Sequence, residues 1–224
     1  MLDLDNQQEV NKRFQSSFVL ILISQFLFLF ASLSVASKFK FPGSDWFGLL
    51  IFFDFIGYIV MGIGLFRIRN INQNLKYALY TFIILVVVNI FQDVCAKSND
   101  DFYIVWSKAL SWSGRFLLGV LYVYLFLGFR DFFFSRNLAR PSRNSRRSGI
   151  AFLSLFVVER LAVFLMFFDG IKQNMVANRV CTYLSWVMVS IIYIYVIVAL
   201  FIILVNMKRK YERKENGTEA KENA

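Results

Sequence analysis

The sequence predicts an all-α, polytopic membrane protein: a bundle of six transmembrane helices with both the N- and C-termini in the cytoplasm. Three observations predict this class. The 224-residue chain is 58% hydrophobic and 18% aromatic, which is more apolar than an ordinary soluble domain. Its apolar residues form long unbroken blocks, which indicate helices in lipid and not a soluble core. Its basic residues gather in alternate connections between those blocks.

Six apolar blocks are long enough to cross a bilayer core of about 30 Å, at about 1.5 Å per helical residue. They cover residues 17–37, 46–66, 77–96, 105–128, 150–169 and 183–205. Together they define a transmembrane domain at residues 17–206. Residues 1–16 form a polar cytoplasmic tail. Residues 207–224 form a basic cytoplasmic tail that we predict to be disordered, because it is charged and lacks apolar periodicity.

The first block has a second interpretation as a signal peptide. Ser34 and Ala36 have the small side chains that precede a signal-peptide cleavage site. The block is nevertheless longer than the apolar region of a usual signal peptide. We therefore predict a first helix that is retained.

Lysine and arginine predict the orientation, because cytoplasmic connections carry the excess of these residues. Most of the 25 lie in the two tails and in the second and fourth connections. The opposite connections hold only Lys38, Lys40, Lys97, Lys172 and Arg179. This asymmetry places both termini and the even-numbered connections in the cytoplasm, and we expect the protein in the cell membrane.

The composition disfavours most catalytic chemistry. The sequence has no histidine and only two cysteines, which removes imidazole bases, histidine-ligated haem and most zinc sites. It also lacks the GxSxG, HExxH and GxxxxGK[ST] signatures. We therefore expect no enzymatic activity, no cofactor and no bound metal.

Four charged residues fall near the middle of the apolar blocks: Asp54, Arg115, Glu159 and Arg160. Each costs about 2.5–3.5 kcal/mol at the centre of a membrane helix on insertion scales. Glu159 and Arg160 project about 100° apart on one helix, so we expect each to find its partner elsewhere. Arg115 would pair with Asp54 or Glu159, and Arg160 with the carboxylate that is left. Two hypotheses remain: structural ion pairs between helices, or a polar cavity for an anionic or zwitterionic substrate or an ion path.

Further polar and aromatic side chains fall at helical spacing on the same faces of these blocks. Such a stripe usually turns toward the interior of a membrane bundle. We predict that the following residues line that interior: Tyr58, Asn89, Gln92, Ser111, Trp112, Tyr122, Trp186 and Ser190.

The most basic stretch is the fourth connection, residues 129–148. Phe132, Phe133 and Phe134 lie within it, which predicts an interfacial helix that inserts aromatic rings among lipid headgroups and ends before Pro141. Its arginines are candidate contacts for anionic lipid: Arg130, Arg136, Arg140, Arg143, Arg146 and Arg147. The alternative is a topology signal without a ligand. Nucleic acid is not expected, because no recognised binding motif accompanies the charge.

Cys95 and Cys181 both lie near the outer ends of their helices. An oxidising exterior would permit a disulfide between them. The alternative is two unrelated small buried residues.

Two functions fit these features. The first is a transport or small-molecule capture component with a polar site at the membrane midplane. The second is a non-catalytic subunit or regulator that contacts another membrane protein through its helices or basic connection. Architecture alone chooses neither.

Overall fold

The computed structural model describes residues 2–37, 46–96, 101–165 and 175–222. Within these residues the chain forms six α-helices and no strand. The helices are α1 (Leu2–Ser37), α2 (Trp46–Ile68), α3 (Gln73–Ala96), α4 (Asp101–Ser135), α5 (Ala139–Leu165) and α7 (Met175–Glu222).

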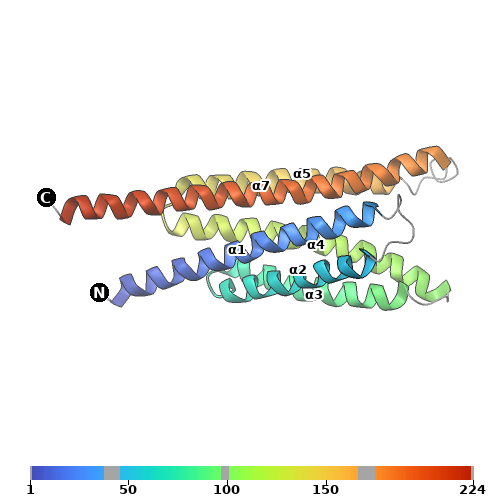
Figure 1. Cartoon of the computed structure of the whole chain (residues 1–224), viewed down its shortest axis with the longest axis horizontal. Helices are drawn as coiled ribbons and strands as arrows, with labels where there is room; N and C mark the ends of the chain where they lie inside the picture. The colour runs from blue at the N-terminus through green and yellow to red at the C-terminus, as the bar shows by residue number, and fades with distance from the viewer. Residues whose placement is uncertain (1, 38–45, 97–100, 166–174, 223–224) are drawn as a thin grey trace.

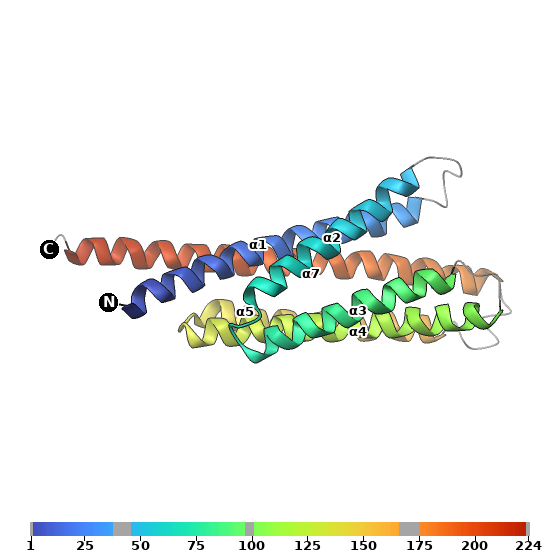
Figure 2. The ribbon, with the colours of Figure 1, turned by 90° about the horizontal axis from the view of Figure 1, so that it is seen from below.

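The helices run alternately up and down the long axis of the molecule, and both termini lie at the same end (Figure 1). We call this the terminal end and the opposite one the distal end. Each helix packs against the next one in the chain, and α7 returns to contact α1. The six helices therefore close into a ring, in which α2 stands opposite α5 (Figure 2).

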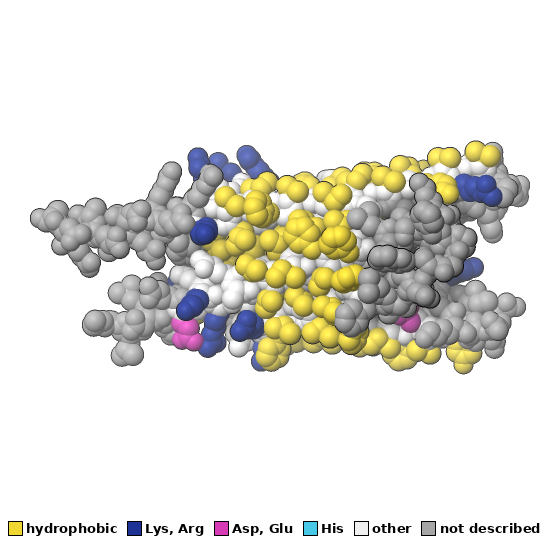
Figure 3. All heavy atoms as spheres, in the orientation of Figure 1, with side chains coloured by type: hydrophobic (Ala, Val, Ile, Leu, Met, Phe, Trp, Pro, Cys, Tyr) yellow, Lys and Arg dark blue, Asp and Glu magenta, His cyan; other side chains and the backbone are white. Residues whose placement is uncertain are grey.

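Five of the helices contain segments long and apolar enough to span a membrane: residues 9–31, 73–95, 105–135, 139–165 and 179–208. Hydrophobic side chains form a band across the middle of the molecule, and lysine and arginine gather beyond it toward the terminal end (Figure 3). The described helices are thus those of a multi-pass membrane protein. A sixth crossing by α2, whose described side chains begin at Phe53, and the cytoplasmic termini stay predictions.

Two helices extend beyond the apolar blocks that predicted them. α1 begins at Leu2, within the predicted tail, and Arg13 forms an ion pair with Glu9 one turn earlier at 2.7 Å. α7 continues to Glu222 through residues predicted to be disordered. Its last five turns contain no proline and many lysine and glutamate residues. These residues have good helix propensity, so the helix continues past its apolar part.

An aromatic cluster closes the interior at the terminal end. Phe14 of α1 stacks on Phe132 of α4 at 3.8 Å between ring centroids and meets Phe129 and Phe133 edge-on at 5.6 Å. The prediction that Phe132 and Phe133 insert among headgroups is therefore wrong: both are buried. The helical extension of α1 supplies an apolar partner for them. Phe134 points away from the cluster and is 77% exposed.

A tight turn joins α4 to α5 in place of the predicted interfacial helix. Asn137 adopts a left-handed conformation with φ 56°. The N–H of Leu138 donates to the carbonyl of Phe133 at 2.8 Å, and that of Asn137 to Phe134 at 3.0 Å. This is a Schellman ending. Pro141 lies inside the first turn of α5, where its missing N–H costs no helical hydrogen bond.

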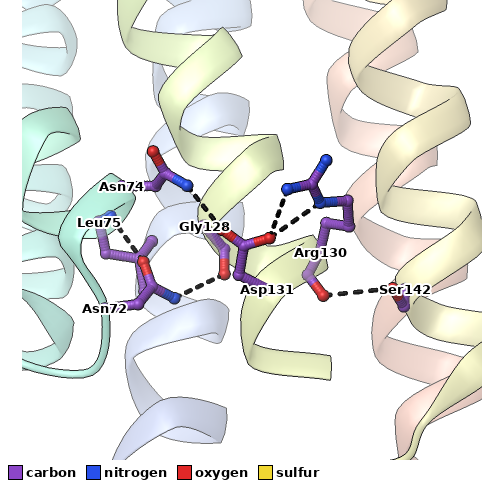
Figure 4. A network of polar contacts seen from close by, with 7 residues as sticks. All are labelled: Asn72, Asn74, Leu75, Gly128, Arg130, Asp131 and Ser142. Carbon is purple, nitrogen blue, oxygen red and sulfur yellow. Dashed lines mark hydrogen bonds and ion pairs between the residues drawn. The ribbon is translucent and has the colours of Figure 1, made fainter. Parts of the chain in front are cut away.

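The connection between α2 and α3 is held against α4. Asn72 caps α3, because its Oδ1 accepts the N–H of Leu75 at 2.9 Å. Its Nδ2 donates to the carbonyl of Gly128 on α4 at 2.8 Å (Figure 4). A methyl group at Gly128 would come within 2.6 Å of the Leu75 side chain. Glycine at this position therefore allows the two helices to approach closely.

Candidate functional site

A central cavity of about 400 Å³ lies in the distal half of the bundle, and all six helices contribute to its wall. Its volume is in the range of small-molecule sites. The four charged residues singled out in the sequence all line it: Asp54, Arg115, Glu159 and Arg160. Tyr58, Asn89, Gln92, Ser111 and Tyr193 add polar groups, and the rest of the wall is largely apolar.

One buried carboxylate serves two arginines in this cavity. Glu159 of α5 is 1% exposed. Arg115 Nη1 of α4 donates to Glu159 Oε1 at 3.2 Å, and Arg160 donates to both carboxylate oxygens. Ser185 of α7 adds a hydroxyl hydrogen bond to Oε1 at 3.3 Å. The cluster carries two formal positive charges and one negative charge, so its net charge is positive.

The expectation that Glu159 and Arg160 find separate partners is wrong. The two residues do leave the helix in different directions, but the arginine side chain is long enough to fold back around its neighbour. Its guanidinium also lies over the rings of Trp112 at 5.5 Å and Phe156 at 5.8 Å. These aromatic faces hold the cation in place.

Asp54 lies on the side of the cavity opposite the Arg115–Glu159–Arg160 cluster. It lies on α2, across the ring from α5. Among the residues that the structure describes, Asp54 forms neither an ion pair nor a hydrogen bond, so the predicted pairing with an arginine is absent. The cavity thus has a negative side and a positive side, and Tyr193 of α7 adds a hydroxyl group to the same wall.

The predicted polar lining divides into two groups. Tyr58, Asn89, Gln92 and Ser111 lie on the cavity wall, and Asn89 Nδ2 donates to the Tyr58 hydroxyl at 2.7 Å. Tyr122 lies on the terminal side of the cavity, where it is fully buried and donates a hydrogen bond to Gln25 Oε1 of α1.

On α7 the cavity face is rotated by about one residue from the predicted stripe. The lining residues are Val189, Ile192 and Tyr193, and Ser185 lies one turn before Val189 on the same face. Ser190 is half-buried beside this face, and the side chain of Trp186 lies outside the described residues. Sequence reasoning therefore missed Ser185. The spacing of Ser185 from Val189 and Ile192, by four and seven residues, was the signal that could have found it.

The basic connection forms a second polar site at the terminal end. Asp131 accepts hydrogen bonds from Asn74 Nδ2 at 2.6 Å and from Arg130 Nε at 2.8 Å (Figure 4). Ser142 Oγ donates to the carbonyl of Arg130 at 3.2 Å and so joins α5 to this network. A cavity of about 590 Å³ beside it is lined by Arg130, Arg143 and Arg146, among others.

The other arginines of the connection lie outside that cavity. Arg136 lies over the ring of Phe132 at 5.7 Å, and Arg140 and Arg147 are exposed. Contact with anionic lipid by any of these arginines stays a prediction.

Cys95 and Cys181 are both free thiols. They lie on α3 and α7, which are not neighbours in the ring. Of the two alternatives for these cysteines, the disulfide is therefore not formed in this structure.

No known protein family matches the chain, and no curated protein or solved structure is similar to it. In the part of the chain that the structure describes, no cluster of three or more acidic or cysteine side chains could hold a metal ion. The fold is that of a multi-pass, all-helical integral membrane protein.

Proposed function

We propose that this protein is a transport or small-molecule capture component of a cell membrane, and that the central cavity is its ligand site. The observation that carries the proposal is that Asp54 has no ion-pair partner among the described residues, although it lies on a cavity wall that also holds the Arg115–Glu159–Arg160 cluster. A purely structural set of charges would be expected to be fully paired and closely packed, because an unpaired buried charge costs several kcal/mol.

A cavity-filling substitution tests this proposal. Ser111 lines the cavity, whereas Ser113 on the same helix is exposed and donates to the carbonyl of Ala109. Ser111→Trp should therefore displace a bound ligand, and Ser113→Trp should not. The measurement is mass spectrometry of small molecules that co-purify with the wild type and with each variant. Identical small-molecule content in all three proteins would contradict the proposal.

A second function is favoured by the Glu159 cluster itself. The carboxylate of Glu159 accepts hydrogen bonds from groups on three helices, α4, α5 and α7. Such a cluster also fits a non-catalytic subunit or regulator, in which the charges only set the packing of the helices. Phe134, an exposed residue of the basic connection at the terminal end, would then be a contact for another membrane protein. Mass spectrometry of co-purifying proteins, with Phe134→Ala as the variant, tests this alternative.

A further inference from the structure

A lateral groove runs between α2 and α3 and meets the central cavity. Its volume is about 810 Å³. Four residues line both spaces: Asp54, Tyr58, Asn89 and Gln92. The groove continues along α2 to Arg67 near the terminal end, a length of about 20 Å at about 1.5 Å per residue. The two helices diverge from their connection toward the distal end, which opens this space (Figure 2).

The walls of the groove are apolar over most of its length. α2 contributes Phe55, Ile59, Ile63 and Phe66, and α3 contributes Phe82, Val86 and Ile90. Several of these side chains are also exposed on the outer surface, Phe55 at 62% and Ile90 at 58%. Ile90 lies in the segment of α3 that is long and apolar enough to span a membrane, and the predicted crossing by α2 would place Phe55 in the bilayer as well. With α2 in the bilayer, the groove would open toward lipid chains and not toward water.

The inner end of the groove is polar and acidic, and it meets a central cavity that also holds arginines. Asp54 lines it without an ion pair among the described residues, and Asp93 lies nearby on the groove wall. Across the central cavity, Arg115 keeps 45% of its side chain exposed although it contacts Glu159. An ammonium group at Asp54 and an anionic group at Arg115 would complement this arrangement, and each contact would be a charge-assisted hydrogen bond.

We propose that the ligand is a zwitterionic amphiphile taken from the membrane, with its head in the central cavity and its apolar chain in the α2–α3 groove. An aqueous zwitterion would use the cavity but would leave the groove without a role. The length of the groove matches a lipid chain, and its polar end includes Asp54 and opens on the cavity that holds Arg115. This inference rests on the proposed function, because it assigns a ligand class to the same cavity.

Equilibrium binding to the full chain in an uncharged maltoside detergent tests the ligand class. The probe is radiolabelled palmitoyl lysophosphatidylethanolamine, which has a zwitterionic head and one chain. Glycerophosphoethanolamine has the same head without the chain, and palmitoyl lysophosphatidic acid has the chain and phosphate without the ammonium. We expect the zwitterionic amphiphile to bind at least about tenfold more tightly than either.

Two variants test whether the head of the amphiphile binds in the central cavity and whether its chain binds in the α2–α3 groove. Asp54→Asn should remove the preference over lysophosphatidic acid, and folding should survive because no ion pair is lost. Ile59→Trp should obstruct the groove and weaken binding of the amphiphile. The control is Val87→Trp on the α3 surface outside both cavities, since Ile59 and Val87 are each 46% exposed. A thermal midpoint confirms that each variant is folded.

Three results would overturn the inference. Equal binding of glycerophosphoethanolamine and the amphiphile, or an Ile59→Trp variant that binds normally, would remove the groove from the site while the central cavity remained a ligand site. Absence of binding by all three probes would exclude this ligand class. In that case the Ser111→Trp comparison still decides separately whether the cavity holds some other small molecule.

Discussion

At the residue scale, Glu159 and Asp54 show how two intramembrane carboxylates can have opposite roles. Glu159 is buried and bonded to two arginines and a serine. Asp54 lies on a cavity wall, where no described residue forms an ion pair or a hydrogen bond with it. Removal of a partner from a buried charge cluster is costly, whereas removal of an unpaired charge is not. The two residues should therefore respond differently to substitution.

Glu159→Leu should destabilise the protein by about 3–5 kcal/mol, because it leaves two arginines without their shared carboxylate. The variant with Arg115→Leu, Glu159→Leu and Arg160→Leu together should recover most of this loss, because apolar groups then replace the whole cluster. Thermal unfolding of the detergent-solubilised proteins measures both effects. Wild-type stability of Glu159→Leu would mean that water, and not Glu159, solvates the two arginines.

The same triple variant separates the two functions. If the cluster only packs helices, the triple variant should recover small-molecule content or partner binding together with its stability. If the cluster is part of a ligand site, the variant should fold but retain no ligand.

Asp54→Asn should leave the free energy of unfolding unchanged or raise it, because the substitution removes an unpaired charge from a partly buried position. The measurement is again thermal unfolding in detergent, with Glu159→Gln as the matched loss of one carboxylate charge. A destabilisation by Asp54→Asn as large as that of Glu159→Gln would show that Asp54 has a stabilising partner.

At the scale of the elements, the contact of α3 with α4 depends on a glycine. Gly128→Ala would bring its methyl group within 2.6 Å of Leu75 and 3.2 Å of a backbone nitrogen. We expect a destabilisation of about 1–3 kcal/mol, the usual range for overpacking. Gly62→Ala is the control, because its methyl group would meet only the Phe82 ring, at 3.1 Å. Equal midpoints for the two variants would show that α3 can shift away from α4 without cost.

The cavity between α4 and α5 allows a specific test of the predicted contact between the arginines of the basic connection and anionic lipid. Arg143→Gln with Arg146→Gln should lower binding of the solubilised protein to phosphatidylserine vesicles, since each basic residue near an anionic surface contributes about 1 kcal/mol. Lys12→Gln with Arg13→Gln removes the same charge at the same end, outside the cavity. If both pairs reduce binding equally, the cavity has no specific role and only the total charge matters.

At the scale of the whole molecule, the even number of helices brings both termini to one end. In a background without Cys95 and Cys181, Ala139→Cys at the terminal end and Val176→Cys at the distal end provide exposed labelling sites. An impermeant maleimide should label Val176→Cys in intact cells, and Ala139→Cys only after permeabilisation. Labelling of Ala139→Cys in intact cells would reverse the orientation.

The sequence by itself determined the class of this protein, because the length and apolarity of a membrane segment are local properties. It also identified the costly charges, since any ionisable residue in such a segment needs an interior partner or water. Only the tertiary structure decided which partners those charges have. Arg160 folds back onto Glu159, and Ser185 of α7 bonds to the same carboxylate. Asp54 has no ion-pair partner among the described residues. These outcomes depend on helix rotation and on side-chain reach, and neither follows from the spacing of residues along one helix. The same reason explains α1 and α4: the predicted tail and the predicted interfacial helix became one buried aromatic cluster, because Phe14 and Phe132 meet only when the ring closes.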